Sequence, residues 1–347
     1  ATAPFGAGAP YLPCLWCAST ASTSCAVADG VVSSSRRRRE TEFRAQLPYA
    51  RHVNDHVVAL DSGALMMVFQ VAGASFETAD VRDLNDWHGK LNQAWRNLAD
   101  DRLAVWHHVV RREVTTSAHQ GYRSAFAADL AAAYDARMSG RRLWVNELFV
   151  TLVIHPGRDG ADRAVAMMRR LRQARRDDGE AMVAQVRRLE EAGRDLAQYL
   201  DRYGPRRLGL YERNGLWFSE PLEIMALILT GRRSPAPLVY GHLGSAAYSD
   251  RTIFGRETLE LRGAAGERFG GILAIKEYPA TTRPGLWDGL LKARFGFVMS
   301  QSFAFLSKAS ARAVMERKQN QMVSARDKAG SQIVGLSDAL DDLVSNR

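Results

Sequence analysis

Cysteine is almost absent from this chain of 347 residues, and the three cysteines, Cys14, Cys17 and Cys25, all lie near its start. The rest of the chain can form no disulfide framework and offers no cysteine nucleophile, which fits a reducing cytoplasm. Cys14 and Cys17 have C-x-x-C spacing. A redox role needs a thioredoxin-like unit and a zinc site needs a second pair of ligands, and neither is nearby, so we expect neither role.

Long apolar runs are also missing. None approaches the ~18 residues that a membrane-spanning helix needs. Hydrophobic residues make up 46% of the chain and charged residues 24%, which are ordinary values for a globular protein with a sizeable core. The length suits about two domains.

Lysine is scarce, with six residues, so arginine supplies almost all of the 47 basic side chains and of the net charge of +9. The arginines are spread over several predicted helices and are interleaved with Asp and Glu. This pattern favours solvated helix faces over a nucleic-acid groove, so we do not expect the chain to bind nucleic acid directly. A basic nucleic-acid-binding module stays the alternative, and an anionic membrane surface is a second partner for such charge.

The phosphate-binding loop G-x-x-x-x-G-K-[ST] does not occur in the sequence. Its backbone N–H groups and lysine would hold the phosphates, and its hydroxyl would hold Mg²⁺. The one Gly-Lys pair, Gly89-Lys90, is followed by Leu91 and has Leu84 where the first glycine should stand. G-x-G-x-x-G and G-x-S-x-G are absent too. We therefore expect no ATP hydrolysis by this chain alone.

Histidine pairs give little support for a metal site. His52 and His56 have i, i+4 spacing, but the Asn-Asp between them does not look helical, and we interpret both as surface histidines. His107 and His108 are neighbours on a predicted strand, so their side chains point to opposite faces and cannot bind one ion. We assign no metal ligands.

Two further groups of residues are candidates for a function. Ser300 and Ser302 lie on a predicted strand with no histidine near in sequence, so hydrogen bonding or packing explains them better than catalysis. Residues 277–279 (Glu-Tyr-Pro) and 283–285 (Arg-Pro-Gly) are typical of turns, and Arg283 is placed to pair with Glu277. A partner-binding edge is the functional alternative there. We assign no catalytic and no cofactor-binding residues.

Hydrophobic periodicity predicts alternating helices and strands. Hairpins are mixed in, which favours an α+β fold with mixed or antiparallel sheets over a doubly wound parallel sheet. The two tryptophans of the first helix are expected in a core. The predicted strands are 57–60, 64–71, 103–110, 148–154, 208–212, 252–254, 258–261, 269–278 and 295–305. The predicted helices are 80–99, 122–138, 161–203 with a break at 177–179, 221–229, 285–293 and one long C-terminal helix from about 308. Turns are predicted at Asp61-Ser62-Gly63 and at Asn214-Gly215, and the 221–229 helix is expected to end at Gly231.

Three regions are expected along the chain. Residues 1–40 are rich in Ala, Ser, Gly and Pro and read as a disordered extension, or as sequence translated from a misplaced start. Residues 41–213 and 214–347 are predicted as two α+β subdomains with packed helices. The last helix has no Gly or Pro stop before Arg347, which suggests a chain cut rather than a natural domain end.

Several short segments occur in an order and spacing that resemble a known family. They are Leu47-Pro48-Tyr49, the 203–208 segment (Tyr-Gly-Pro-Arg-Arg-Leu), Thr230-Gly231-Arg232, Asp250-Arg251, the 270–285 segment with Lys276-Glu277-Tyr278-Pro279, and Gln301-Ser302-Phe303. Over residues 45–347 they resemble the N-terminal and central region of the type IV secretion ATPases, the CagE/TrbE/VirB family.

The resemblance implies the non-motor portion of an ATPase for conjugal transfer or secretion, followed in the family by a RecA-like domain that would bind ATP and Mg²⁺. It implies a cytoplasmic protein, peripheral at the inner membrane, that contacts inner-membrane subunits and its own ATPase domain and assembles as a hexamer. The early stop raises the alternatives of a fragment, a split gene or a pseudogene product. Extending the reading frame past Arg347 and searching for a phosphate-binding loop would decide among them.

Overall fold

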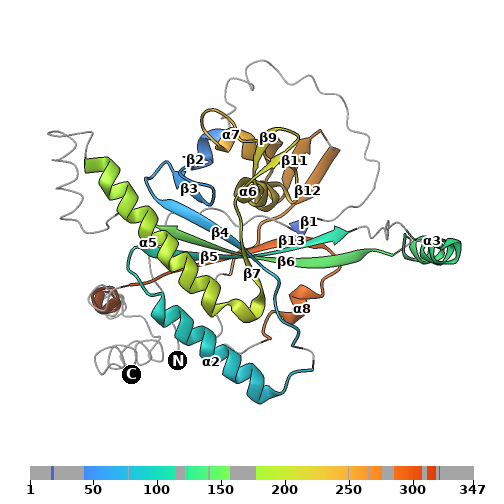
Figure 1. The fold of residues 1–347 in the computed structure, drawn as a ribbon, viewed down its shortest axis with the longest axis horizontal. Helices are drawn as coiled ribbons and strands as arrows, with labels where there is room; N and C mark the ends of the chain where they lie inside the picture. The colour runs from blue at the N-terminus through green and yellow to red at the C-terminus, as the bar shows by residue number, and fades with distance from the viewer. Residues whose placement is uncertain are drawn as a thin grey trace.

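One long antiparallel sheet runs through the molecule, and helices lie on both of its faces (Figure 1). The predicted α+β class is therefore confirmed. The computed structural model describes residues 17–18, 43–76, 78–114, 122, 124–139, 141–156, 177–248, 250–264, 266–275, 285–306, 311–317 and 320.

The elements follow one another along the chain with strands predominating. The strands are β1 (Cys17–Ala18), β2 (Tyr49–His52), β3 (Val57–Leu60), β4 (Leu65–Val71), β5 (Leu103–Val114), β6 (Leu143–Ile154), β7 (Pro205–Arg207), β8 (Leu210–Arg213), β9 (Leu216–Ser219), β10 (Arg251–Phe254), β11 (Leu259–Gly263), β12 (Gly266–Gly270) and β13 (Gly296–Ala304). The helices are η1 (Phe43–Gln46), α2 (Val81–Asn97), α3 (Ala125–Ser139), α5 (Asp177–Tyr199), η2 (Asp201–Tyr203), α6 (Glu220–Thr230), α7 (Gly244–Ala247) and α8 (Asp288–Leu291).

The strand order of the main sheet is β10-β11-β12-β1-β13-β5-β6-β4-β3-β2, with β7 also paired to β4, and β8 and β9 form a separate hairpin. Each pairing between described strands is antiparallel, so the mixed sheet that the sequence left open is not what forms. β13 pairs with β5 along eight residues. The predicted boundary between 213 and 214 stays a prediction, and this ladder joins strands from its two sides.

Strand β4 shows why the sheet has a core on each face. Leu65, Met67 and Phe69 belong to one buried cluster, and Met66 and Val68 belong to the other. Because successive side chains of a strand point to opposite faces, a strand covered on both sides reads as a continuous apolar run. The sheet is thus the middle layer of three.

Helix α5 covers the first face through Leu189, Leu196 and Leu200, which are buried against the sheet. Its Gly193 stands where an added Cβ would lie 2.6 Å from the Sδ atom of Met67, which is fully buried in β4. The helix can approach the sheet so closely because this position has no side chain. Figure 1 shows α5 and α2 on this side of the sheet.

Helix α6 covers the opposite face, and its limits follow from its ends. Ser219 at the N-cap accepts a hydrogen bond from the backbone N–H of Leu222 at 3.3 Å, and Pro221 lies in the first turn. Gly231 ends the helix with a φ of 65°, a left-handed conformation that glycine adopts at little cost. The predicted helix and its end at Gly231 are confirmed.

Two predicted turns are also confirmed by backbone geometry. Gly63, between β3 and β4, has a φ of 80°, and Asn214 and Gly215, between β8 and β9, have φ values of 55° and 75°. Two successive residues with positive φ are what a two-residue hairpin loop requires, which explains the Asn-Gly pair.

The predicted strand over 208–212 is wrong in its limits. The chain instead forms β7, turns inward so that Leu208 is fully buried, and starts β8 at Leu210. At Gly209 an added Cβ would lie 2.5 Å from the Nδ1 atom of His56 and 3.1 Å from the Asp55 carbonyl oxygen. At Gly209 the chain passes close to the backbone of Asp55 and the ring of His56. Strand β7 therefore ends before this point, and β8 begins after it.

Other limits differ as well. The strand predicted over 269–278 is β12, which ends at Gly270 because its partner β11 begins at Leu259, the residue paired with Gly270. The helix break at 177–179 is the first turn of α5, and the helix at 285–293 is only the short α8. Strand β9 was not predicted. Trp95 packs at the α5-side core as expected, whereas Trp87 lies under the Arg202 guanidinium, 3.7 Å from the ring centre.

Several predictions lie wholly or partly outside the described residues. They concern residues 161–176, residues 276–284, and the long C-terminal helix, of which the structure describes a helical stretch over 311–317. Within residues 1–40, only Cys17–Ala18 is described, and it pairs with β12 and β13.

We predict that Gly193→Leu lowers the free energy of unfolding by about 1–3 kcal/mol, because the new side chain must displace Met67 inside a packed core. Gly89→Ala in α2 is the matched control, since its added Cβ meets nothing within 4 Å. We expect it to raise stability by up to about 1 kcal/mol. Urea unfolding of both variants measures the difference, and equal stabilities would contradict the close approach of α5.

Candidate functional site

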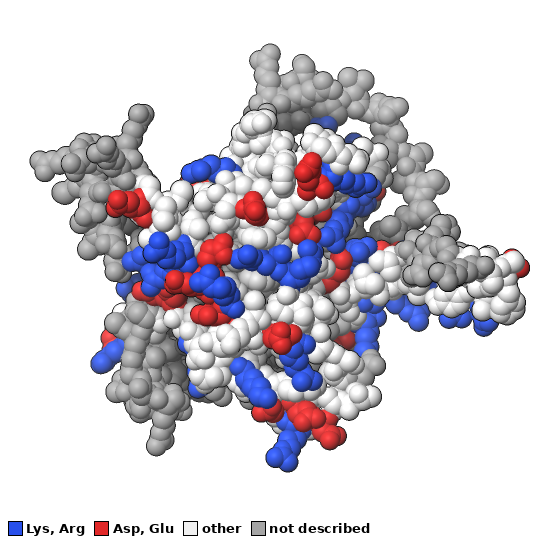
Figure 2. Space-filling view, viewed as in Figure 1, with Lys and Arg blue, Asp and Glu red and all other residues white. Residues whose placement is uncertain are grey.

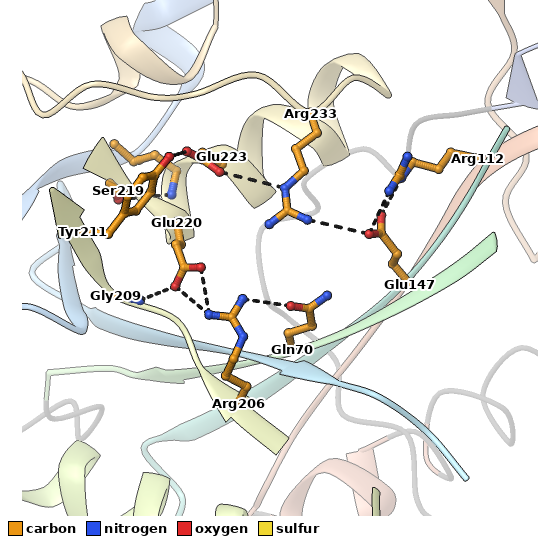
Figure 3. A network of polar contacts seen from close by, with 11 residues as sticks. Gln70, Arg112, Glu147, Arg206, Gly209, Tyr211, Ser219, Glu220, Glu223 and Arg233 are labelled. Atoms are coloured by element: carbon orange, nitrogen blue, oxygen red, sulfur yellow. Dashed lines mark hydrogen bonds and ion pairs between the residues drawn. The ribbon is translucent and has the colours of Figure 1, made fainter. Parts of the chain in front are cut away.

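The family-like 203–208 segment lies where the sheet meets α6. Gly204 has a φ of 58°, which turns the chain out of η2, and the next three residues form β7 beside β4. Arg206 of this segment joins a polar network that connects the sheet with α6 and the β8–β9 hairpin (Figure 3). The network consists of Gln70, Arg112, Glu147, Arg206, Gly209, Tyr211, Ser219, Glu220, Glu223 and Arg233.

Arg206 bridges β4 and the first residue of α6. Its Nη1 donates to the Oε1 and Oε2 atoms of Glu220 at 2.8 and 3.0 Å, and its Nη2 donates to Gln70 Oε1 at 2.9 Å. Glu220 Oε2 also accepts from the Gly209 N–H at 3.1 Å. A carboxylate in the first helical turn is favoured by the partial positive charge of the free N–H groups there. The Arg206 guanidinium and the Glu220 carboxylate therefore join α6, β4 and the chain at Gly209.

A second set of contacts surrounds Glu147 on β6. Arg112 donates to both of its oxygens, at 2.7 and 3.1 Å. Arg233 lies between Glu147, at 3.7 Å, and the buried Glu223, at 3.9 Å. Tyr211 donates its hydroxyl to Glu223 Oε1 at 2.5 Å. Burial and this hydrogen bond raise the pKa of Tyr211 to about 12, so the phenol keeps its proton.

Ser219 adds a third connection. Its hydroxyl is fully buried, caps α6, and lies 2.8 Å from His52 Nε2 on β2. Burial lowers the pKa of His52 below its usual value, which favours the neutral ring. The network therefore pairs each of its arginines with a carboxylate and keeps its tyrosine protonated. These contacts hold α6 and the β8–β9 hairpin to the sheet, and they include no group arranged for catalysis.

Comparisons with known proteins match two successive parts of the chain to described families. The family described as "Type IV secretion system ATPase VirB4/TrbE, N-terminal domain" matches residues 56–162. The family described as "CagE, TrbE, VirB family, component of type IV transporter system" matches residues 206–347. Together the two matches cover most of the chain. The chain belongs to the VirB4/TrbE family of type IV secretion ATPases.

Relatives in this family are similar along nearly the whole chain. "Type IV secretion system protein virB4" of Bartonella henselae is 44% identical over 313 residues, which is 90% of this chain and 40% of that protein. "Protein virB4" of Agrobacterium fabrum is 40% identical over 88% of this chain and 38% of its own length. "Type IV secretion system protein PtlC homolog" of Bordetella bronchiseptica is 30% identical, with 89% and 38% covered. The chain thus spans about 40% of the length of such relatives.

The Gly89-Lys90 pair lies in the middle of α2, where Lys90 forms an ion pair with Asp86 at 2.7 Å. A helix interior has its N–H groups bonded within the helix, so it cannot cradle a phosphate. His52 and His56 have separate partners: Ser219 for the first and the Leu208 carbonyl oxygen, at 3.0 Å, for the second.

Within the described part of the chain, no three His, Cys, Asp or Glu side chains are grouped to hold a metal ion. Its helices also include none with the length and apolar character needed to cross a bilayer. The 277–279 turn and Arg283 lie outside the described residues.

Ser300 has a histidine partner that the sequence did not reveal. Ser300 on β13 pairs in register with His108 on β5, and the Ser300 hydroxyl lies 2.7 Å from His108 Nδ1. His108 is buried beside Trp106, and burial lowers its pKa to about 3. The pair is a hydrogen bond within the sheet, as expected for Ser300. Only the register of β13 against β5 would have shown the partner.

We predict that Ser219→Ala lowers the free energy of unfolding by about 1–2 kcal/mol, since the cap of α6 is lost and His52 loses its partner. Ser75, which is exposed in the loop after β4, provides the control, and Ser75→Ala is expected to change stability by less than about 0.5 kcal/mol. Chemical unfolding monitored by circular dichroism measures both. A cost for Ser219→Ala no larger than that of the control would refute the capping role.

We also predict a pH dependence that His108 causes. Between about pH 6.5, where an unfolded histidine titrates, and pH 3, the unfolded chain binds a proton at His108 and the folded chain does not. Stability must therefore fall as the pH falls through this window. In His108→Gln, which cannot take up a proton, the loss should be smaller by about 1 kcal/mol per pH unit. Urea unfolding between pH 5 and 7 tests this, and identical slopes would contradict it.

Proposed function

We propose that this chain is the non-motor portion of a type IV secretion ATPase, which docks to inner-membrane subunits and supports assembly of the ATPase for protein or DNA transfer. The observation that carries the proposal is the succession of two matches to this one family, over residues 56–162 and 206–347. The sequence meanwhile contains no phosphate-binding loop.

The division of labour follows from chemistry. ATP hydrolysis needs backbone and lysine contacts to the phosphates and a hydroxyl on Mg²⁺. We place these groups, with ATP and Mg²⁺, in the C-terminal RecA-like domain of the whole protein. This chain would bind that domain, contact membrane subunits at the cytoplasmic face, and take part in a hexamer.

The surface of the layered body supports a docking role, because it exposes apolar side chains. Around the β8–β9 hairpin the structure exposes the apolar side chains of Leu216, Trp217 and Tyr240, the first two by 62% and 51%. The Trp217 carbonyl oxygen accepts a hydrogen bond from the Leu238 N–H at 2.8 Å, so the segment that contains Leu238 lies along the hairpin. Clustered exposed apolar residues are typical of protein contacts.

Nucleic-acid binding is the second candidate, and the net charge of +9 is its support. Many of the arginines are neutralised by nearby carboxylates, as in the ion pairs of Arg112, Arg142, Arg188, Arg206 and Arg207. Figure 2 shows basic and acidic side chains interspersed. A nucleic-acid groove needs a continuous basic surface whose binding weakens steeply with salt. This distribution supports the docking proposal instead.

The proposal predicts that the chain, co-expressed with the membrane subunits of its own secretion system and solubilised in detergent, co-purifies with at least one of them. It also predicts no ATPase activity above a blank. An unrelated inner-membrane protein of similar abundance is the control. If none of the membrane subunits co-purifies with the chain, the docking role is overturned. If the chain instead captures duplex DNA in a salt-sensitive manner, the second candidate is favoured.

A further inference from the structure

The longest strands of the sheet extend beyond it as a two-stranded arm. β5 and β6 pair along their full twelve residues, from Leu103 with Ile154 to Val114 with Leu143. β13 accompanies β5 only as far as Arg111, and β4 accompanies β6 only from Leu148. The outer residues of β5 and β6 therefore pair with each other alone, and α3 lies at their end, apart from the layered body (Figure 1).

Charged and aromatic side chains brace this arm. Arg142 binds both oxygens of Glu113 across the strands, with its Nη2 3.0 Å from Oε2. The guanidinium groups of Arg111 and Arg142 lie 5.4 and 5.7 Å from the Trp144 ring centre. Arg111 Nε also donates to the Ala293 carbonyl oxygen at 2.5 Å, which fixes the base of the arm to the segment after α8. A two-stranded ribbon alone is marginally stable, and these contacts hold it extended.

The helix at the end of the arm exposes a stripe of apolar side chains. Phe126, Leu130 and Tyr134 recur every four residues, so they share one face of α3, and they are 77%, 61% and 55% exposed. None of the described side chains of α3 is buried. One exposed apolar residue is ordinary, whereas three aligned on a helix held away from its own core indicate a contact elsewhere.

Basic residues continue the same face. Arg137 follows Tyr134 by three positions and therefore lies in line with the stripe, and Arg141 comes directly after the helix; both are exposed. Residues 122–142 contain four arginines, near the two ends, and two aspartates. The aligned apolar side chains can enter the boundary between headgroups and acyl chains, and the arginines are attracted to anionic lipid headgroups.

The dimensions argue for a bilayer over a protein. A helix of 15 residues is about 22 Å long and about 10 Å across, so one face offers on the order of 200 Å². A stable protein–protein interface needs about 800 Å² from each partner. A single convex helix can instead lie in a bilayer surface at a depth of about 5–10 Å, which is roughly one side chain deep.

We propose that α3 is a lipid-binding tip, which inserts Phe126, Leu130 and Tyr134 among the acyl chains of an anionic bilayer while Arg137 and Arg141 contact its headgroups. The β5–β6 arm sets the distance between the bilayer and the layered body. This inference rests on the proposed function only in placing the chain at a membrane.

Vesicle flotation of the full 347-residue chain tests the tip. We expect binding to vesicles that contain phosphatidylglycerol and weak binding to phosphatidylcholine alone. Phe126→Ser/Leu130→Ser/Tyr134→Ser should abolish binding, and Arg137→Gln/Arg141→Gln should weaken binding to the anionic vesicles about tenfold or more. Phe254→Ser/Phe269→Ser is the matched control, because it removes exposed apolar side chains from the body. It should bind like the unchanged chain.

The same variants in detergent separate this proposal from the docking role. Unchanged subunit capture by the triple α3 variant, together with its loss of flotation, supports a lipid tip. The proposal is overturned if the unchanged chain does not float with anionic vesicles, or if the triple variant floats as well as the unchanged chain. It is equally overturned if the triple variant changes only subunit capture or self-association. Circular dichroism confirms that each variant is folded, and failure of the unchanged chain to capture any subunit counts against the docking role alone.

Discussion

The hydrogen-bonded ladder between β5 and β6 is the contact on which the other elements depend. It joins twelve residue pairs without an interruption, and β13 and β4 add to its two sides. Because each strand fixes the position of its neighbour at about 4.8 Å, this pair places both cores, the strands on either side and the arm at one time. A slip of β5 by one residue against β6 would move Val105 out of its core and towards the opposite face of the sheet.

The polar network performs a related task in the direction across the sheet. Hydrophobic burial attaches α6 to the sheet but does not fix its position, since apolar contacts have no direction. The guanidinium fork of Arg206, held by Glu220 and Gln70, and the buried Ser219 cap supply that direction. The family-like 203–208 segment thus serves the joint between layers, which explains how a segment without catalytic groups can be characteristic of a family.

Local signals predicted much of the fold. The Asn214-Gly215 turn, the Gly63 turn and the end of α6 at Gly231 depend on backbone conformations that few residues adopt, so the residue type announces them. Helix α5 and strand β4 follow from periodicity and apolar content. What could not be predicted depends on neighbours distant in sequence. The crossing at Gly209 needs His56, and the hydrogen bond between His108 and Ser300 spans 192 positions. The ion pairs of Arg112, Arg206 and Arg233 likewise appear only once the strands and α6 are in place.

The position of β13 has a consequence for how the chain is made. β13 fills the side of β5 that β6 leaves open, yet it is synthesised almost two hundred residues after it. A ribosome that adds about 5–20 residues per second needs roughly 10–40 seconds to cover that interval. During this time β5 is an edge strand with unpaired backbone groups, which is the kind of surface that recruits other chains. The nascent protein therefore has a period of exposure to aggregation that ends only when Ala304 has left the exit tunnel, and chaperones would matter most within that period.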